Sequence, residues 1–192
     1  MGTTQPIRDK NELFAFRSYY REVKPHARNY ALIVLGLNTA LRISDMLNLK
    51  WKDVYDFRKK DVRSHLLLVE SKTGKSNAVA LNAHVREALL ALFRESFPEK
   101  EAFIFSKHTH PEHHLNRTQA YNIIKEAASH TVSERAISCH SLRKTFGYHA
   151  WKQGIPPILL MHVFNHSSYQ ITKRYLGIEQ DEKDALYLNI ML

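Results

Sequence analysis

The chain has 192 residues, 44% of them hydrophobic, and its 28 Lys and Arg outnumber its 19 Asp and Glu to give a formal charge of +9. This balance is typical of one globular domain and favours a polyanionic partner such as nucleic acid. It excludes a membrane-spanning helix, because no stretch approaches the roughly 18 consecutive apolar residues that spanning requires. A single cysteine excludes an intrachain disulfide or a thiolate metal site. The polar start, Met1 to Lys10, lacks a secretory signal, so we expect a cytoplasmic protein.

The first part of the chain predicts helices. Asp9 is placed to cap a helix that carries apolar residues on one side, and Pro25 precedes a second helix that runs through Leu37. Ser44 is expected to cap a short third helix.

A small sheet is predicted next. Residues 65–70 form an apolar run, a Thr-Gly pair follows as a turn signal, and residues 77–81 alternate as Asn-Ala-Val-Ala-Leu. We therefore expect an antiparallel sheet of about three strands.

The rest of the chain predicts helices again. Asn82 caps an amphipathic helix, and Pro98 opens a polar loop that extends to Leu115. Further helices are expected at roughly 117–129, 140–153, 157–164 and 168–176, with a last one from Asp181 to the end. Because no repeat or long linker divides the chain, we expect residues 1–192 to form a single α+β domain that is predominantly helical.

Three short clusters carry the reactive side chains. Arg42 lies in an Ala-Leu-Arg-Ile-Ser-Asp run, His140 and Arg143 lie in a His-Ser-Leu-Arg run, and His166 lies in an Asn-His-Ser-Ser run that Tyr175 follows. A guanidinium fork matches the oxygens of a phosphate and stays charged at any usable pH. Two such forks are suited to hold a phosphodiester, and the phenol is then the candidate nucleophile.

In order and spacing these clusters resemble the boxes of the tyrosine recombinase, or phage integrase, family. The resemblance to the family's catalytic domain covers nearly the whole chain. Two departures are small: Asn165 stands where glycine is usual, and Asp45 replaces the commoner glutamate. Asparagine adopts left-handed backbone conformations more easily than most residues, so the first is tolerable. With no separate N-terminal domain before Arg42, the chain resembles short catalytic-domain-only integrases of Gram-positive bacteria and their phages, and we expect it to be naturally short.

The resemblance implies a site-specific DNA recombinase that joins Tyr175 to DNA through a 3′-phosphotyrosyl intermediate and leaves a free 5′-hydroxyl. Arg42, Arg143 and His166 would donate hydrogen bonds to the non-bridging phosphate oxygens, where charge concentrates in the transition state. These donors substitute for a metal ion, and no cofactor is implied. Double-stranded DNA is the expected partner, on which protomers would assemble, as a tetramer.

The resemblance also implies two proton carriers. The family places a lysine at the tip of a β-hairpin, and Lys72 aligns with it better than Lys75; it would protonate the departing 5′ oxygen as general acid. His140 would assist proton transfer near the phosphate or the tyrosine. Asp45 would orient Arg42.

Other functions remain open from the sequence. A type IB topoisomerase uses the same constellation to relax supercoils, and a catalytically idle DNA-binding relic of a mobile element would retain the fold. Four histidines in the loop at 108–114 suggest zinc but lack a second set of spaced ligands, so a solvated loop near DNA is favoured. The apolar end of the chain, residues 185–192, must be buried, either on its own core or on a neighbouring protomer.

Overall fold

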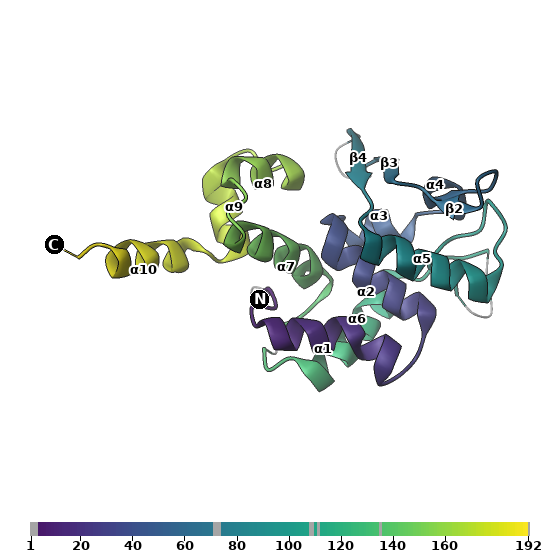
Figure 1. Cartoon of the computed structure of the whole chain (residues 1–192), viewed down its shortest axis with the longest axis horizontal. Helices are drawn as coiled ribbons and strands as arrows, with labels where there is room; N and C mark the ends of the chain where they lie inside the picture. The colour runs from purple at the N-terminus through teal and green to yellow at the C-terminus, as the bar shows by residue number, and fades with distance from the viewer. Residues whose placement is uncertain (1–3, 71–73, 108–109, 111, 135, 192) are drawn as a thin grey trace.

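The computed structural model describes residues 4–70, 74–107, 110, 112–134 and 136–191 (Figure 1). Over these residues the helices are α1 (Lys10–Glu22), α2 (Ala27–Thr39), α3 (Ile43–Leu47), α4 (Trp51–Val54), α5 (Ala83–Ser96), α6 (Arg117–Thr131), α7 (Cys139–Lys152), α8 (Pro157–Phe164), α9 (Tyr169–Leu176) and α10 (Glu179–Asn189). The strands are β1 (Tyr55–Asp56), β2 (Asp61–Val62), β3 (His65–Val69) and β4 (Ser76–Ala80). No described helix has both the length and the apolar character needed to cross a membrane.

A large core holds the body of the molecule, which consists of α1 to α6 and the strands. Helix α2 is the centre of this core, because residues 31–35 are all buried whichever side of the helix they occupy. Helices α1, α5 and α7 pack around it. The predicted caps of α1 and α5 are confirmed: the Asp9 side chain accepts from the backbone of Asn11 and Glu12, and Asn82 accepts from Val85.

The strands form two antiparallel pairs rather than one sheet of about three strands. Strand β1 pairs with β2, and β3 pairs with β4 in a register that runs from His65 opposite Ala80 to Val69 opposite Ser76. The difference arises at Asp56, whose carboxylate accepts from the next backbone amides, those of Arg58 and Lys59. That local turn closes residues 55–62 into a hairpin of their own.

One predicted cap is wrong, and the correction matters for the site. Helix α2 ends at Ala40 in the left-handed conformation (φ 54°, ψ 17°), and the chain then restarts as α3 with Arg42, not Ser44, as the N-cap. The backbone amides of Asp45 and Met46 donate to the Arg42 carbonyl, which places Ser44 inside the helix. The arginine side chain therefore leaves from a sharp corner between two helices.

A smaller core holds the C-terminal part, α7 to α10. It consists of Ala40, Tyr148, Leu160, Phe164, Leu176 and Ile178. Gly147 makes this packing possible, because a Cβ there would lie 2.5 Å from Phe164 Cζ and 2.6 Å from Leu176 Cδ2. Helix α10 buries none of its residues and projects from the rest of the molecule (Figure 1).

Candidate active site

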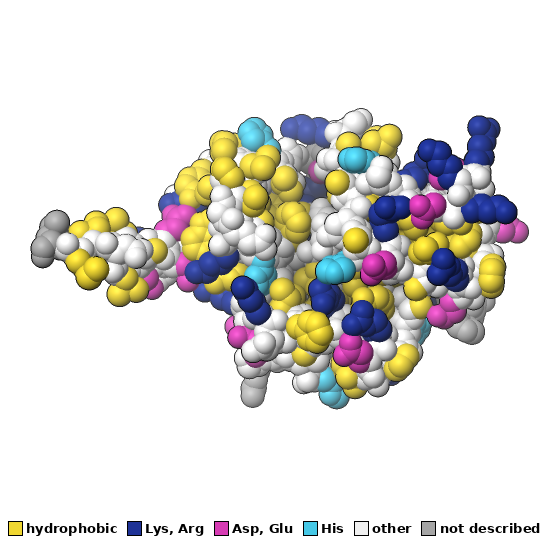
Figure 2. All heavy atoms as spheres, viewed as in Figure 1, with side chains coloured by type: hydrophobic (Ala, Val, Ile, Leu, Met, Phe, Trp, Pro, Cys, Tyr) yellow, Lys and Arg dark blue, Asp and Glu magenta, His cyan; other side chains and the backbone are white. Residues whose placement is uncertain are grey.

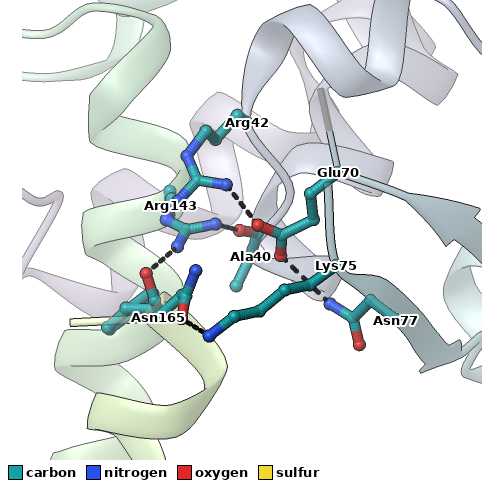
Figure 3. Close-up of polar contacts among 8 residues, drawn as sticks. Ala40, Arg42, Glu70, Lys75, Asn77, Arg143 and Asn165 are labelled. Carbon is teal, nitrogen blue, oxygen red and sulfur yellow. Dashed lines mark hydrogen bonds and ion pairs between the residues drawn. The ribbon is translucent and has the colours of Figure 1, made fainter. Parts of the chain in front are cut away.

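Arg143 is the link between the two parts of the molecule. It lies on α7, is 6% exposed, and donates through Nη1 to the Ala40 carbonyl and through Nη2 to the Phe164 carbonyl at 2.9 Å (Figure 3). Its guanidinium carbon lies 4.8 Å from the centre of the Phe164 ring. Burial lowers the pKa of Arg143, but an arginine stays charged throughout the working pH range. One side chain thus joins the end of α2 to the end of α8 and brings a cation to the seam.

Arg42 is paired with a carboxylate that the sequence analysis did not identify. Its Nη1 lies 2.6 Å from Glu70 Oε2, and the two side chains are 18% and 7% exposed. Asn77 on β4 donates to the other Glu70 oxygen at 3.4 Å. The sequence signal was faint: an acidic residue at the end of an apolar run, 28 residues from Arg42. Asp45, which was expected to orient Arg42, is itself buried. Its negative charge raises the pKa of Arg143.

The turn between α8 and α9 presents His166 beside Tyr175. Asn165 ends α8 in the left-handed conformation (φ 53°, ψ 48°), as expected from the ease with which asparagine adopts it. His166 follows, and its Nδ1 lies 3.1 Å from the hydroxyl of the buried Thr172, which fixes the orientation of the ring. The rings of His166 and Tyr175 meet edge to face with centres 5.1 Å apart.

Tyr175 is partly buried and lies in the field of both arginines. Burial is the largest effect and raises the pKa of the phenol. The charges of Arg143 and Arg42 and a hydrogen bond from Arg143 act in the opposite direction and lower it. The phenol is therefore neutral near pH 7, and negative charge developing on its oxygen meets two guanidinium groups. The structure thus brings Arg42, Arg143, His166 and Tyr175 together at the seam.

His140 is exposed at the start of α7. Desolvation lowers its pKa most, and the positive charges of Arg117, Lys144, Arg143 and Arg42 lower it further below the ordinary 6.5. An imidazole in this position is neutral at pH 7 and is therefore able to accept a proton.

Two lysines near the site, Lys144 and Lys75, each donate a hydrogen bond to a different part of the chain. Lys144 donates to the Thr4 carbonyl at 2.7 Å, with its ammonium 5.1 Å from the centre of the Tyr175 ring. Lys75 donates to Asn165 Oδ1 at 2.9 Å.

Lys72, the predicted general acid, lies outside the described residues. Of the loop histidines, His108 lies outside them as well, and the rest of the described chain holds no group of three or more His, Cys, Asp or Glu suited to bind a metal ion.

Fold and site together define a class of protein, in which two arginines and one histidine gather around a tyrosine phenol. The model of the phage integrase family matches residues 9–182. This chain belongs to the phage integrase family. The predicted resemblance and the predominantly helical fold with small antiparallel sheets are confirmed.

Similar proteins carry recombinase names. The probable integrase/recombinase YoeC of Bacillus subtilis is 35% identical over 187 residues, which cover 97% of each protein. The tyrosine recombinase XerS of Streptococcus equi subsp. zooepidemicus is 28% identical over 168 residues, or 85% of this chain and 46% of that protein. The chain thus spans nearly all of YoeC and about half of XerS.

The structure of the XerH site-specific recombinase bound to palindromic difH substrate has a similar fold. It superposes with a TM-score of 0.73 over 96% of this chain and 53% of that chain, at 22% identity. At this identity the similarity shows the fold.

Proposed function

We propose that this chain is a site-specific DNA recombinase that cuts and rejoins strands through a covalent bond between Tyr175 and a 3′ phosphate. The observation that carries this function is the position of the Tyr175 phenol, which is partly buried and lies in the field of both Arg143 and Arg42. The names of YoeC and XerS favour a recombinase over a topoisomerase of type IB.

Cleavage follows from the chemistry of these groups. The Tyr175 oxygen attacks phosphorus, the bond from phosphorus to the 5′ oxygen breaks, and the phenolic proton passes to the neutral His140. Lys72 protonates the departing 5′ oxygen. A 5′-hydroxyl from another duplex then attacks the phosphotyrosyl bond and reverses these steps, so no external energy source is needed.

The arginines stabilise the charge that develops on the phosphate. Preorganised donors of this kind each contribute about 10²- to 10³-fold in rate. Arg42 still has donors for a phosphate, because a guanidinium carries five N–H groups and Glu70 Oε2 is bound to Nη1 alone. His166 is the third donor that we assign to the non-bridging oxygens.

We further propose that the chain binds double-stranded DNA and that copies assemble on it as a tetramer. Helix α10 supports the assembly, because Leu186, Tyr187 and Leu188 are 57%, 78% and 78% exposed. Figure 2 shows hydrophobic side chains along the segment that projects from the body. A second copy of the chain is the partner that we assign to this surface, so the apolar end would be buried in trans rather than on its own core.

Covalent trapping tests the function. A nicked suicide duplex carrying the repeats that flank the encoding locus prevents religation, so a recombinase accumulates as a protein–DNA band. We expect the band with the wild-type chain and with Tyr121→Phe, a control tyrosine on α6 that is 41% exposed. We expect none with Tyr175→Phe. A band that survives Tyr175→Phe, or no band with the wild type, would contradict the proposal.

A plasmid assay separates recombinase from topoisomerase. Junction products that depend on two copies of the site support recombination. Relaxation of any supercoiled plasmid without such products would instead assign the type IB reaction.

A further inference from the structure

Lys144 is a buried lysine that directly follows Arg143 on α7. It is 9% exposed, and burial lowers the pKa of its ammonium because the charged form has lost water. The ammonium donates to the Thr4 carbonyl at 2.7 Å and lies 5.1 Å from the centre of the Tyr175 ring. A carbonyl oxygen and the electron-rich face of an aromatic ring both favour a cation. These two contacts therefore compensate for the water that the ammonium has lost.

The Thr4 carbonyl has a fixed direction. It belongs to the peptide group between Thr4 and Gln5, whose N–H donates to the Ala136 carbonyl at 3.1 Å. Because a peptide group is planar, bonds at both of its ends set its orientation. Gln5 also precedes a proline, which restricts its backbone to extended conformations, and Ile7 is 1% exposed in the large core. The acceptor of Lys144 is therefore held by the body of the molecule.

The other ring contacts of Tyr175 come from the C-terminal part. The ring centres of Phe164 and His166 lie 5.4 and 5.1 Å from that of Tyr175, and the tyrosine packs against the small core. These contacts place the ring relative to α8 and the turn that follows it. Lys144 adds a contact of a different kind, because it connects the ring through Thr4 to the segment that Ile7 anchors in the large core.

A cation is suited to this position because its attraction to the ring grows during the reaction. The face of a neutral phenol ring carries a partial negative charge that attracts an ammonium. As the phenol gives up its proton, more negative charge spreads into the ring. An interaction that is stronger in the transition state than in the ground state raises the rate of the chemical step.

We propose that Lys144 is a positioning residue for the nucleophile, and that its ammonium, held by the Thr4 carbonyl, fixes the Tyr175 ring so that the phenol points at the scissile phosphorus. The inference rests on the proposed function, because it concerns the geometry of the attacking group. A direct phosphate contact is the alternative role of a lysine beside DNA, and the test distinguishes the two.

The test measures the cleavage rate and the DNA affinity separately. Single-turnover cleavage of the suicide duplex, with protein in excess, gives the rate, and the Kd is measured at several salt concentrations in the Tyr175→Phe background, where no covalent bond forms. Lys144→Met removes the charge, whereas Lys144→Arg keeps it and still donates to a carbonyl. We expect Lys144→Met to cleave about 10-fold more slowly with an unchanged Kd, and Lys144→Arg to stay within about threefold of the wild-type rate.

Two further variants make the comparison secure. Lys152→Met is the matched control, because Lys152 is an exposed lysine on the same helix whose ammonium lies 5.0 Å from the Trp151 ring, which is not the nucleophile. It should cleave at the wild-type rate. Lys144→Gln is uncharged but retains a polar head, and it replaces Lys144→Met in the comparison if urea unfolding shows that the methionine variant does not fold.

The outcomes distinguish this inference from the proposed function. Wild-type cleavage by the uncharged variant, or an arginine variant as slow as the uncharged one, would overturn the positioning role. A weaker Kd whose salt slope falls by about one would assign Lys144 to a phosphate contact and overturn it as well. In each case the wild-type band and its loss in Tyr175→Phe keep the function. Absence of any wild-type band overturns both.

Discussion

The body and the C-terminal part hold their halves of the active site by different means. The body presents Arg42 and Glu70 from elements packed on the large core, whereas Tyr175 and His166 belong to helices whose core is small. The nucleophile is positioned mainly by polar links across the seam, with Arg143 the most buried of them. The half that carries the nucleophile is therefore the more sensitive to single substitutions.

The start of the chain adds a second set of links to the C-terminal part. The Ile7 amide donates to Thr145 Oγ1 at 2.9 Å. Arg8 donates to the Gly177 carbonyl at 2.8 Å and pairs with Asp181 at 3.2 Å. This segment joins α7 to the junction of α9 and α10, so it compensates in part for the small core.

The largest effect is expected for Arg143→Ala, because this residue serves both halves. Cleavage should slow by about 10³-fold or more through loss of a phosphate donor. The free energy of unfolding should fall by about 2–4 kcal/mol, since two buried carbonyls lose a charged donor. Single-turnover cleavage and urea unfolding measure the two losses. Arg58→Ala, in an exposed turn, is the control. An Arg143→Ala cleavage rate within tenfold of the wild-type rate would contradict the view that Arg143 serves both parts of the molecule.

His140 should give the next largest effect and a pH signature. A lowered pKa means that the imidazole becomes protonated only below its ordinary 6.5, so cleavage should rise with pH through a value below 6.5 and then level off. Because burial raises the pKa of Tyr175 above its ordinary 10, ionisation of the phenol does not contribute to this rise. His140→Gln should slow cleavage by about 10²-fold at pH 7 and abolish the acidic limb. If the cleavage rate of the variant still rises with pH over the same acidic range, another group is responsible for the titration.

A pair of core variants separates stability from activity. Gly147→Ala should cost about 1–3 kcal/mol of unfolding free energy through overpacking against Phe164, and should also slow cleavage because Phe164 lies against Tyr175. Leu89→Ala, in the large core, should cost about 2–5 kcal/mol but retain near wild-type cleavage under native conditions. Equal cleavage by the two variants would remove the distinction between the parts.

The smallest effect on stability is expected for Arg8→Gln, below about 1 kcal/mol, because its ion pair with Asp181 is exposed. Its visible consequence should be local. With the junction after Gly177 released, trypsin should cut faster after Lys183 in the DNA-free protein than in the wild type. A wild-type rate of cutting would show that Arg8 does not restrain α10.

Local signals in the sequence predicted most of the helices and the caps at Asp9 and Asn82, but not the cap at Arg42. Asp9 and Asn82 precede apolar periodic segments, and the boxes around Arg42, Arg143 and Tyr175 are read from consecutive residues. The polar links were not predictable in this way. Glu70 and Arg42 are 28 residues apart, Lys75 and Asn165 are 90 apart, and nothing in either neighbourhood encodes its partner.

Several roles stay predictions, among them Lys72 as general acid, the tetramer and residues 1–192 as one domain.

The most direct test of the account is the identity of the residue that becomes joined to DNA. Trypsin should release the covalent complex as a nucleotide adduct on the peptide of residues 175–183, in which Tyr175 is the sole tyrosine. Mass spectrometry should locate the phosphate on that side chain. An adduct on any other residue would contradict the proposal that the two arginines at the seam activate phosphorus for Tyr175.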